Sequence, residues 1–406
     1  MSKSKLRIGI IGTGSRGIHC FGRLLSHRDD ACVVALCDPN PVRLDLSSRT
    51  FSPAPACYTS IREMAGREKL DAVVITSPDY CHESNAVEAL KCGLHVLIDK
   101  PLSTTVKGCR AICRAARDAG KTVMIGFNLR QEPTLKRLKA LIDEGALGKV
   151  FLIENREFYG GGRTYMARWN RSYALSGGLW VHKGSHDFDV FNWLLGFPKP
   201  RKVTAMAGIN VLHPGGIPFP VEAEKPVGPT CTACAYRATC PDVYPEIADM
   251  EAWGAAAQKA DGYAKDLCIY TSDKDTHDNG VAIVEYENGA RASHLECFVT
   301  SASDRRYTVV GDLGQAEVSL HDRTITLRKR WSQELTTLQI APVAGSHGGA
   351  DPGLVDSFLR VIRGETPNPS TLENGLYSTA IGQAAEIARR EDRVVFIEEL
   401  LSATDA

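Results

Sequence analysis

Three glycines stand at positions 12, 14 and 17, directly after an apolar run at 6–11 and before a segment with helical periodicity. In this setting the first glycine permits a tight turn, the second lets a pyrophosphate approach the backbone, and the third lets helix and strand pack closely. The free N–H groups of a helix N-terminus attract phosphates. An ordinary glycine-rich turn is the alternative. We predict a phosphate-binding loop made of Gly12, Thr13, Gly14, Ser15, Arg16 and Gly17.

A carboxylate stands where the second strand of such a fold would end. Asp38 follows Gly17 at about the 20-residue distance from which an acidic residue bonds the ribose hydroxyls of a dinucleotide. Its charge repels a 2′-phosphate, so the sequence favours NAD over NADP. Arg43 leaves NADP open, because a guanidinium can bind that phosphate. Asp38 could also simply cap a turn or a helix.

A second set of polar residues follows two glycines at 177 and 178. If 179–196 is one helix, His182, His186 and Asp189 share a face at i, i+4 and i+7. The ordinary pKa of histidine suits proton removal from a hydroxyl near neutral pH. We predict His186 as general base, with His182 as a second candidate or a structural histidine. Lys183 and Asp189 are predicted to contact the substrate.

Lys100 stands between Asp99 and a proline, at the end of the apolar run 95–98. At the carboxyl end of a strand near a cofactor crevice, desolvation would lower the pKa of this lysine and suit it to acid–base chemistry. A lysine that only caps a strand at the surface is the alternative. We predict Lys100 as a catalytic residue.

A glycine-rich loop before the two histidines carries arginine and aromatic side chains. Trp169 could stack on a sugar ring, and Arg163 could bind a carboxylate with its planar fork of donors. We predict both as substrate-binding residues, which brings acidic sugars into consideration. A solvated basic loop with a buried tryptophan is the alternative.

Four of the 13 cysteines lie in a Pro- and Gly-rich excursion at about 212–280. Four thiolates could complete a tetrahedral structural zinc site, with free thiols as the alternative. The odd number of cysteines, scattered over a long chain, fits a reducing cytoplasm better than a disulfide framework. The candidate zinc ligands are Cys231, Cys234, Cys240 and Cys268.

The composition excludes several kinds of partner. The 48 basic and 48 acidic residues cancel, so no overall field draws this 406-residue chain to nucleic acid. No run approaches the roughly 20 apolar residues of a membrane-spanning helix, and the first residues lack the apolar core of a signal peptide. We therefore expect a cytoplasmic protein with a small-molecule partner, no nucleic acid and no membrane.

The length and spacing of the apolar segments predict two domains. Short apolar runs alternate with helical segments up to about residue 125, which is typical of a parallel, doubly wound sheet. From residue 150 the runs are longer and alternate in polarity, as antiparallel strands do. We predict an α/β Rossmann domain over 1–128. An α+β domain over 129–406, with a large open and mostly antiparallel sheet, would serve for substrate binding and oligomerisation.

These motifs together resemble the Gfo/Idh/MocA family of sugar and inositol dehydrogenases. The resemblance runs through Thr76-Ser-Pro, His82 and the segment 93–101, where Asp-Lys-Pro replaces the family's Glu-Lys-Pro. In the segment 177–196, His186 matches the family histidine and Asp189 a later aspartate, whereas His182 replaces the first aspartate. The resemblance implies a homo-oligomer, a dimer or tetramer, and cofactor contacts by Ser77, Pro78, His82, Asp99 and Lys100.

We therefore expect an NAD-dependent oxidoreductase that moves hydride between nicotinamide and a hydroxyl of a sugar, sugar acid or cyclitol, with Lys100 bonding that hydroxyl. Some members of the family imply an alternative, an NAD-dependent glycosidase that acts by transient oxidation, elimination, water addition and re-reduction, on an acidic sugar glycoside for example. A third alternative is a regulator that senses NAD without chemistry. The presence of both Lys100 and His186 argues against it.

Overall fold

The computed structural model describes residues 4–244 and 254–402. Its first sheet has six parallel strands in the order β3-β2-β1-β4-β5-β6. The strands are β1 (Leu6–Ile11), β2 (Ala31–Cys37), β3 (Ala56–Tyr58), β4 (Ala72–Ile75), β5 (His95–Ile98) and β6 (Val123–Ile125). The accompanying helices are η1 (Arg16–Gly22), α1 (Arg23–Ser26), α2 (Pro41–Ser48), α3 (Ile61–Arg67), α4 (His82–Lys91) and α5 (Val106–Ala119).

Local sequence explains where these helices begin and end. The side chain of Asn40 caps α2 by accepting hydrogen bonds from the backbone N–H groups of Val42 and Arg43. Thr105 caps α5 in the same way, and Gly120, with a φ of 59°, ends that helix in the left-handed region. β4 is buried along its whole length, as expected for a strand covered by helices on both faces. The predicted Rossmann arrangement is confirmed.

The second sheet has nine strands in the order β14-β13-β12-β11-β7-β10-β9-β8-β15. Its neighbours pair antiparallel except β7 and β10, which run parallel. The predicted mostly antiparallel sheet is thus confirmed. The strands are β7 (Val150–Phe158), β8 (Pro200–Gly208), β9 (Asn279–Tyr286), β10 (Arg291–Cys297), β11 (Asp304–Gly311), β12 (Gly314–Ser319), β13 (Thr324–Lys329), β14 (Leu335–Gln339) and β15 (Val395–Phe396).

Helices join the two sheets. α13 (Leu372–Glu391) contacts β8 of the second sheet and α5 of the first domain. α12 (Ser346–Ile362) comes from the part of the chain predicted to form the second domain, yet its Leu354 and Phe358 share a hydrophobic core with Ile8 of β1. The remaining helices are α6 (Pro133–Asp143), α7 (Tyr173–Ser176), α8 (Leu179–His182), α9 (Ser185–Leu194) and α14 (Ile397–Ser402).

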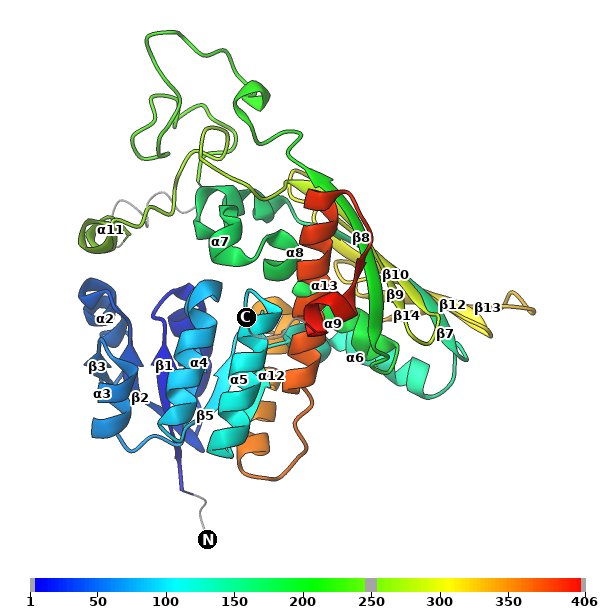
Figure 1. Cartoon of the computed structure of the whole chain (residues 1–406), viewed down its shortest axis with the longest axis horizontal. Coiled ribbons are helices and arrows are strands. Elements are labelled where there is room, and N and C mark those ends of the chain that lie inside the picture. The colour runs from blue at the N-terminus through cyan, green and yellow to red at the C-terminus, as the bar shows by residue number, and fades with distance from the viewer. Residues whose placement is uncertain (1–3, 245–253, 403–406) are drawn as a thin grey trace.

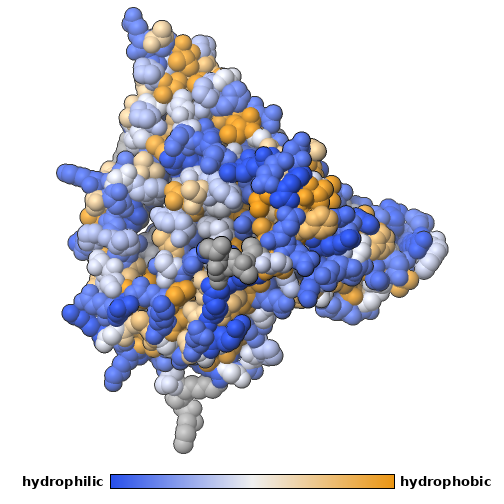
Figure 2. Space-filling model, in the orientation of Figure 1, coloured by the Kyte–Doolittle hydropathy of each residue, from blue (hydrophilic) through white to orange (hydrophobic). Residues whose placement is uncertain are grey.

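The excursion between β8 and β9 extends above both domains and brings α11 over the outer edge of the Rossmann domain (Figure 1). Its helix α11 (Ala255–Asp261) lies directly over α2. On the face shown in Figure 2, hydrophilic residues cover most of the surface and hydrophobic residues form separate groups between them. Within the described ranges, no helix has the length and apolar character needed to cross a membrane.

Candidate active site

The glycine loop has the shape of a cradle for a dinucleotide. A Cβ atom on Gly12 would lie 2.5 Å from the backbone nitrogen of Ser77, and one on Gly17 would lie 2.2 Å from the carbonyl oxygen of Gly12. The Cβ position of Gly14 meets nothing within 4 Å, so this glycine faces open space. Two glycines thus allow close packing and the third leaves room for a ligand, as a bound pyrophosphate requires.

Asp38 lies at the end of β2, beside this loop. One carboxylate oxygen accepts hydrogen bonds from the backbone nitrogen and the hydroxyl of Thr13, at 2.9 and 3.0 Å. The other accepts the backbone N–H of Asn40 at 2.9 Å. A carboxylate has about four lone-pair sites. Asp38 can therefore accept a further hydrogen bond from a ribose hydroxyl.

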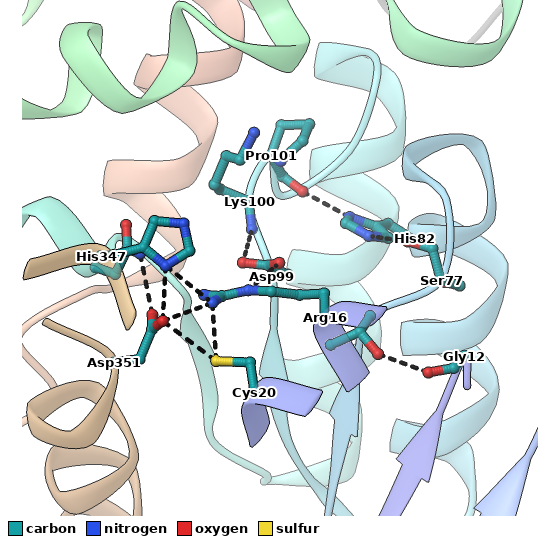
Figure 3. Close-up of polar contacts among 12 residues, drawn as sticks. Gly12, Arg16, Cys20, Ser77, His82, Asp99, Lys100, Pro101, His347 and Asp351 are labelled. Atoms are coloured by element: carbon teal, nitrogen blue, oxygen red, sulfur yellow. Dashed lines mark hydrogen bonds and ion pairs between the residues drawn. The ribbon is translucent and has the colours of Figure 1, made fainter. Parts of the chain in front are cut away.

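Arg16 belongs to the predicted phosphate loop, but its side chain points away from the glycines (Figure 3). Its guanidinium forms ion pairs of 2.9 Å with Asp99 and with Asp351 of α12. His347, also from α12, contacts Asp351 through Nδ1 at 2.7 Å. The Arg16 side chain therefore ties the glycine loop to the strand end before Lys100 and to α12, while the loop backbone remains available for phosphates.

The turn after β4 and the residue that follows it, His82, connect the ends of β4 and β5. The His82 ring lies between the carbonyl oxygens of Pro101, at 2.7 Å, and Ser77, at 3.0 Å (Figure 3). Pro78 precedes the turn η2 (Asp79–Cys81), which carries a buried carboxylate. Ser77 and His82 line the cavity between the two domains, whereas Pro78 does not.

A cavity of about 820 Å³ lies between the two domains, next to the carboxyl ends of β4 and β5. Open α/β sheets bind their ligands at this edge. Charged and aromatic side chains from both domains line it, among them Arg16, Asp79, Asp99, Lys100, Glu157, Tyr165, Arg168, Trp169, His182, Lys183, His186, Arg305 and His347.

Lys100 reaches into this cavity and is held there by the chain. Its ammonium group donates a hydrogen bond of 2.5 Å to the carbonyl oxygen of His182. Burial lowers its pKa to about 8, although the nearby carboxylates of Asp79 and Asp99 oppose the shift. The ammonium form therefore prevails at neutral pH and can be lost within the ordinary working range of an enzyme.

His182 lines the cavity, but both of its ring nitrogens already have partners. Nδ1 lies 2.7 Å from the Asp79 carboxylate and Nε2 lies 3.0 Å from the side-chain amide of Asn170. With Nδ1 protonated, Nε2 accepts from the amide, and the ring is neutral. Burial also lowers its pKa well below the ordinary value. The geometry fits a positioning residue for Lys100, not the catalytic role predicted from sequence.

His186 also lines the cavity, and its buried Nδ1 atom has no hydrogen-bond partner. Burial, together with the positive charge of Lys100, lowers its pKa well below 6.5. The ring is therefore neutral near pH 7. This is the chemical state that a general base requires.

The predicted single helix over 179–196 is in fact broken. α8 ends at His182, Lys183 and Gly184 intervene, and α9 begins at Ser185. Asp189 lies on α9 together with His186 but does not line the cavity: its carboxylate is buried and paired with the guanidinium of Arg130. The prediction that Asp189 binds substrate is wrong. Its role is structural, because a buried charge requires a partner.

Lys183, which the sequence predicts to contact the substrate, lines the cavity and belongs to a network of alternating charges. Its ammonium lies 3.0 Å from Glu157, which also pairs with Arg305 at 2.6 Å. Arg305 in turn lies 2.9 Å from the buried Asp187. This network neutralises both cations and holds them in place along one wall of the cavity.

The glycine-rich loop contributes Trp169 and a different arginine from the one predicted. Arg163 pairs with Asp242 at 3.1 Å, donates to the carbonyl oxygen of Gly160, and does not line the cavity. Its prediction as a substrate-binding residue is therefore wrong. Arg168 lines the cavity instead.

The zinc prediction is not supported. The four cysteines of the excursion are free thiols around a small cavity. In the part of the chain that the structure describes, no three His, Cys, Asp or Glu side chains form a group that could hold a metal ion.

A Rossmann cleft that ends at a cavity with a neutral histidine and a buried lysine is the arrangement of a dinucleotide-dependent oxidoreductase. Residues 6–127 match the family model for the NAD-binding Rossmann fold of the Gfo/Idh/MocA oxidoreductases, and residues 139–397 match the model for their C-terminal alpha/beta domain. The chain belongs to this family, which confirms the resemblance seen in the sequence.

Individual proteins of known name are similar to this chain in sequence. YteT of Bacillus subtilis (strain 168) is 29% identical over 96% of this chain and 97% of its own length. An inositol 2-dehydrogenase/D-chiro-inositol 3-dehydrogenase of Halalkalibacterium halodurans is 29% identical over 48% of this chain and 57% of its own length. A 2,7-anhydro-N-acetylneuraminate hydratase of Mediterraneibacter gnavus is 27% identical over 51% and 53%. The last two alignments thus span about half of each relative.

The same fold occurs in solved structures. The WlbA dehydrogenase of Bordetella pertussis, in complex with NADH and UDP-GlcNAcA, matches with a TM-score of 0.69 and 19% identity over 97% of this chain and 98% of that one. At this identity the match shows the fold alone.

Proposed function

We propose that this oxidoreductase is NAD-dependent and transfers hydride between the nicotinamide and a hydroxyl-bearing carbon of a sugar, sugar acid or cyclitol. The observation that carries the proposal is that His186, with a pKa well below 6.5, lines the same cavity as Lys100, whose ammonium form prevails at neutral pH. Bound NAD would supply the hydride acceptor. Gly12, Gly14 and Gly17 would hold its pyrophosphate through the loop backbone, and Asp38 would hold its ribose.

The residues of the chain divide the proton chemistry between them. Lys100 donates a hydrogen bond to the reacting oxygen and stabilises negative charge on it, and His186 accepts the hydroxyl proton. His182 and Asp79 hold the Lys100 side chain in place through the His182 carbonyl. Trp169 and Tyr165 offer aromatic faces against which the apolar side of a sugar ring can lie.

The experiment that tests this function is absorbance at 340 nm with NAD and a panel of sugars, sugar acids, cyclitols and aryl glycosides, with aglycone release followed in parallel. NADH formation matched to substrate consumption is the expected result. If no compound yields NADH or is turned over with NAD or NADP, the proposal fails.

A second candidate is net conversion without NADH release, as in a redox glycosidase or a hydratase. His347 favours it, because it adds another histidine to the cavity and has Asp351 on its Nδ1 atom. Elimination and water addition need an extra proton donor and acceptor of this kind. The hydratase among the relatives points in the same direction. In the panel, aglycone release or hydration that depends on NAD without net NADH would identify this activity.

The charges of the cavity favour an acidic substrate. Arg16, Lys183 and Arg305 each form an ion pair with a carboxylate. Lys100 lies near the carboxylates of Asp79 and Asp99. Arg168 is different: it donates to the Thr164 hydroxyl at 2.5 Å, and its buried Nε atom has no hydrogen-bond partner among the described residues. A substrate carboxylate would satisfy this guanidinium.

Replacing Arg168 with glutamine is therefore expected to raise KM for a sugar acid by about 10- to 100-fold, the cost of one charge-assisted hydrogen bond to a carboxylate. KM for the matching neutral sugar should change little. Arg163→Gln is the control, because it removes the same charge from the same loop outside the cavity. Equal effects of the two substitutions on KM for the acid would contradict the assignment.

We also propose a homo-oligomer formed through the outer face of the nine-stranded sheet. The pairing register places Leu152, Met206, Ile283 and Leu295 on the face opposite the core, and all four are substantially exposed. An open sheet face with several apolar side chains is suited to burial against a second copy.

A further inference from the structure

The excursion between β8 and β9 brings a carboxylate to the cofactor domain from more than 200 residues away in the sequence. Asp261, the last residue of α11, accepts a hydrogen bond of 2.6 Å from the side-chain amide of Asn40. The same oxygen lies 3.0 Å from the guanidinium of Arg43 on α2. Asn40 also donates to the carbonyl oxygen of Ala257 at 3.0 Å, so α11 is fixed to the start of α2 at two points.

These contacts lie next to the ribose end of the dinucleotide cleft. The backbone nitrogen of Asn40 donates to Asp38, the carboxylate at the end of β2. Asp261 is thus joined through the single residue Asn40 to the group that faces the ribose hydroxyls. Figure 1 shows α11 directly over α2 at this edge of the Rossmann domain.

Arg43 is the one feature in the sequence that favours NADP, because it lies on the helix that follows Asp38. In the structure its guanidinium is largely buried and paired with Asp261, while its buried Nε atom has no hydrogen-bond partner within residues 4–244 and 254–402. The group therefore has donors to offer a phosphate, but an adjacent carboxylate neutralises its charge. A 2′-phosphate would also meet the negative charges of Asp261 and Asp38 together.

We propose that Asp261 is a specificity-determining residue for the cofactor, which selects NAD over NADP by holding Arg43 in an ion pair. The selection rests on the proposed NAD-dependent function and adds to it a determinant outside the Rossmann domain.

The aromatic ring of Tyr263, two residues after Asp261, lies 5.8 Å from the Arg43 guanidinium. The Tyr263 hydroxyl lies 3.5 Å from the backbone nitrogen of Trp169 at the substrate cavity. The segment 254–263 therefore reaches from the ribose end of the cleft to the substrate loop.

The test is to measure the dissociation constants of NAD and NADP by titration calorimetry with the full-length protein, which needs no knowledge of the sugar substrate. Asp261→Ala is expected to lower Kd for NADP roughly ten-fold or more, because Arg43 becomes free to bind the 2′-phosphate. Kd for NAD should change less than about three-fold. The double variant Arg43→Ala/Asp261→Ala should lose the gain in NADP affinity.

The matched control is Asp45→Ala. Asp45 lies on α2, is exposed, and pairs with Arg49 one turn along the same helix. Its removal changes the net charge by the same amount and releases an arginine at the surface. Kd for NADP should be unaffected. An equal gain in Asp45→Ala, or a gain that persists without Arg43, would overturn the role of Asp261.

The wild-type protein separates this inference from the proposed function. If it binds neither dinucleotide, or binds NADP more tightly than NAD, the proposed NAD dependence fails. If it prefers NAD and Asp261→Ala leaves the Kd for NADP unchanged, the function stands and the inference fails. Because Asp261→Ala also removes a contact of α11, Asp261→Asn serves as a second variant. It keeps a hydrogen-bond acceptor for Asn40, and it should produce a gain in NADP affinity of the same sign.

Discussion

Lys100→Met is expected to lower kcat for NADH formation by about a thousand-fold, with a much smaller change in the Kd for NAD. The substitution keeps the length of the side chain but removes the buried ammonium that would stabilise charge on the reacting oxygen, and such groups contribute roughly two to three orders of magnitude. The glycine loop and Asp38 remain to bind the cofactor. The measurement is steady-state kinetics on the substrate identified at 340 nm.

The pH profile separates this role from a structural one. Burial lowers the pKa of Lys100 to about 8, and the active form is the protonated one. Wild-type activity should therefore fall as pH rises through about 8, and Lys100→Met should lack this alkaline limb. Lys100→Arg, which stays protonated, should retain part of the activity without the limb. Near-normal turnover in Lys100→Met would remove Lys100 from the mechanism.

His186→Gln is expected to lower kcat by about 10² to 10⁴-fold, the usual contribution of a positioned general base. Glutamine preserves polarity and approximate volume but has no group that takes up a proton in this range. The expected signature is the loss of the acidic limb of the pH profile. In the wild type this limb lies well below pH 6.5, because burial and the charge of Lys100 both lower the pKa of His186.

The two substitutions can be checked against each other. Without the charge of Lys100, the pKa of His186 should rise, so the acidic limb of Lys100→Met should move to higher pH. His182→Gln is the control. It replaces the other histidine of this segment, whose ring nitrogens already have partners. It should lower activity less than His186→Gln and keep the acidic limb. If His182→Gln alone abolishes that limb, the base has been assigned to the wrong histidine.

The Rossmann domain was predictable because its signals are local. The strands β1, β2, β4 and β5 are predominantly apolar runs, and the glycines at 12, 14 and 17 follow β1 directly at the spacing of a phosphate-binding loop. β3 and α3 escaped prediction because each is short and weakly patterned. Lys100 and His186 were found from their spacing within family motifs. Asp79 stands directly after Ser77-Pro78, and its place in that motif was a signal that could have identified it.

What the tertiary structure decided is which polar side chains have partners. Arg163 and Arg168 belong to the same loop, yet within the part of the chain that the structure describes only Arg163 meets a carboxylate, because Asp242 comes from the distant excursion. Glu157 and Arg305 line the cavity together because β7 and β11 place them opposite each other.

Asp189 was misassigned because its carboxylate pairs with Arg130, a residue that lies far from it in the sequence. By itself, the sequence determined the elements and the motif residues, since periodicity and turn chemistry act over a few residues. The pairing of charges depends on residues that lie far apart along the chain, so only the folded structure could show which groups remain free for a ligand.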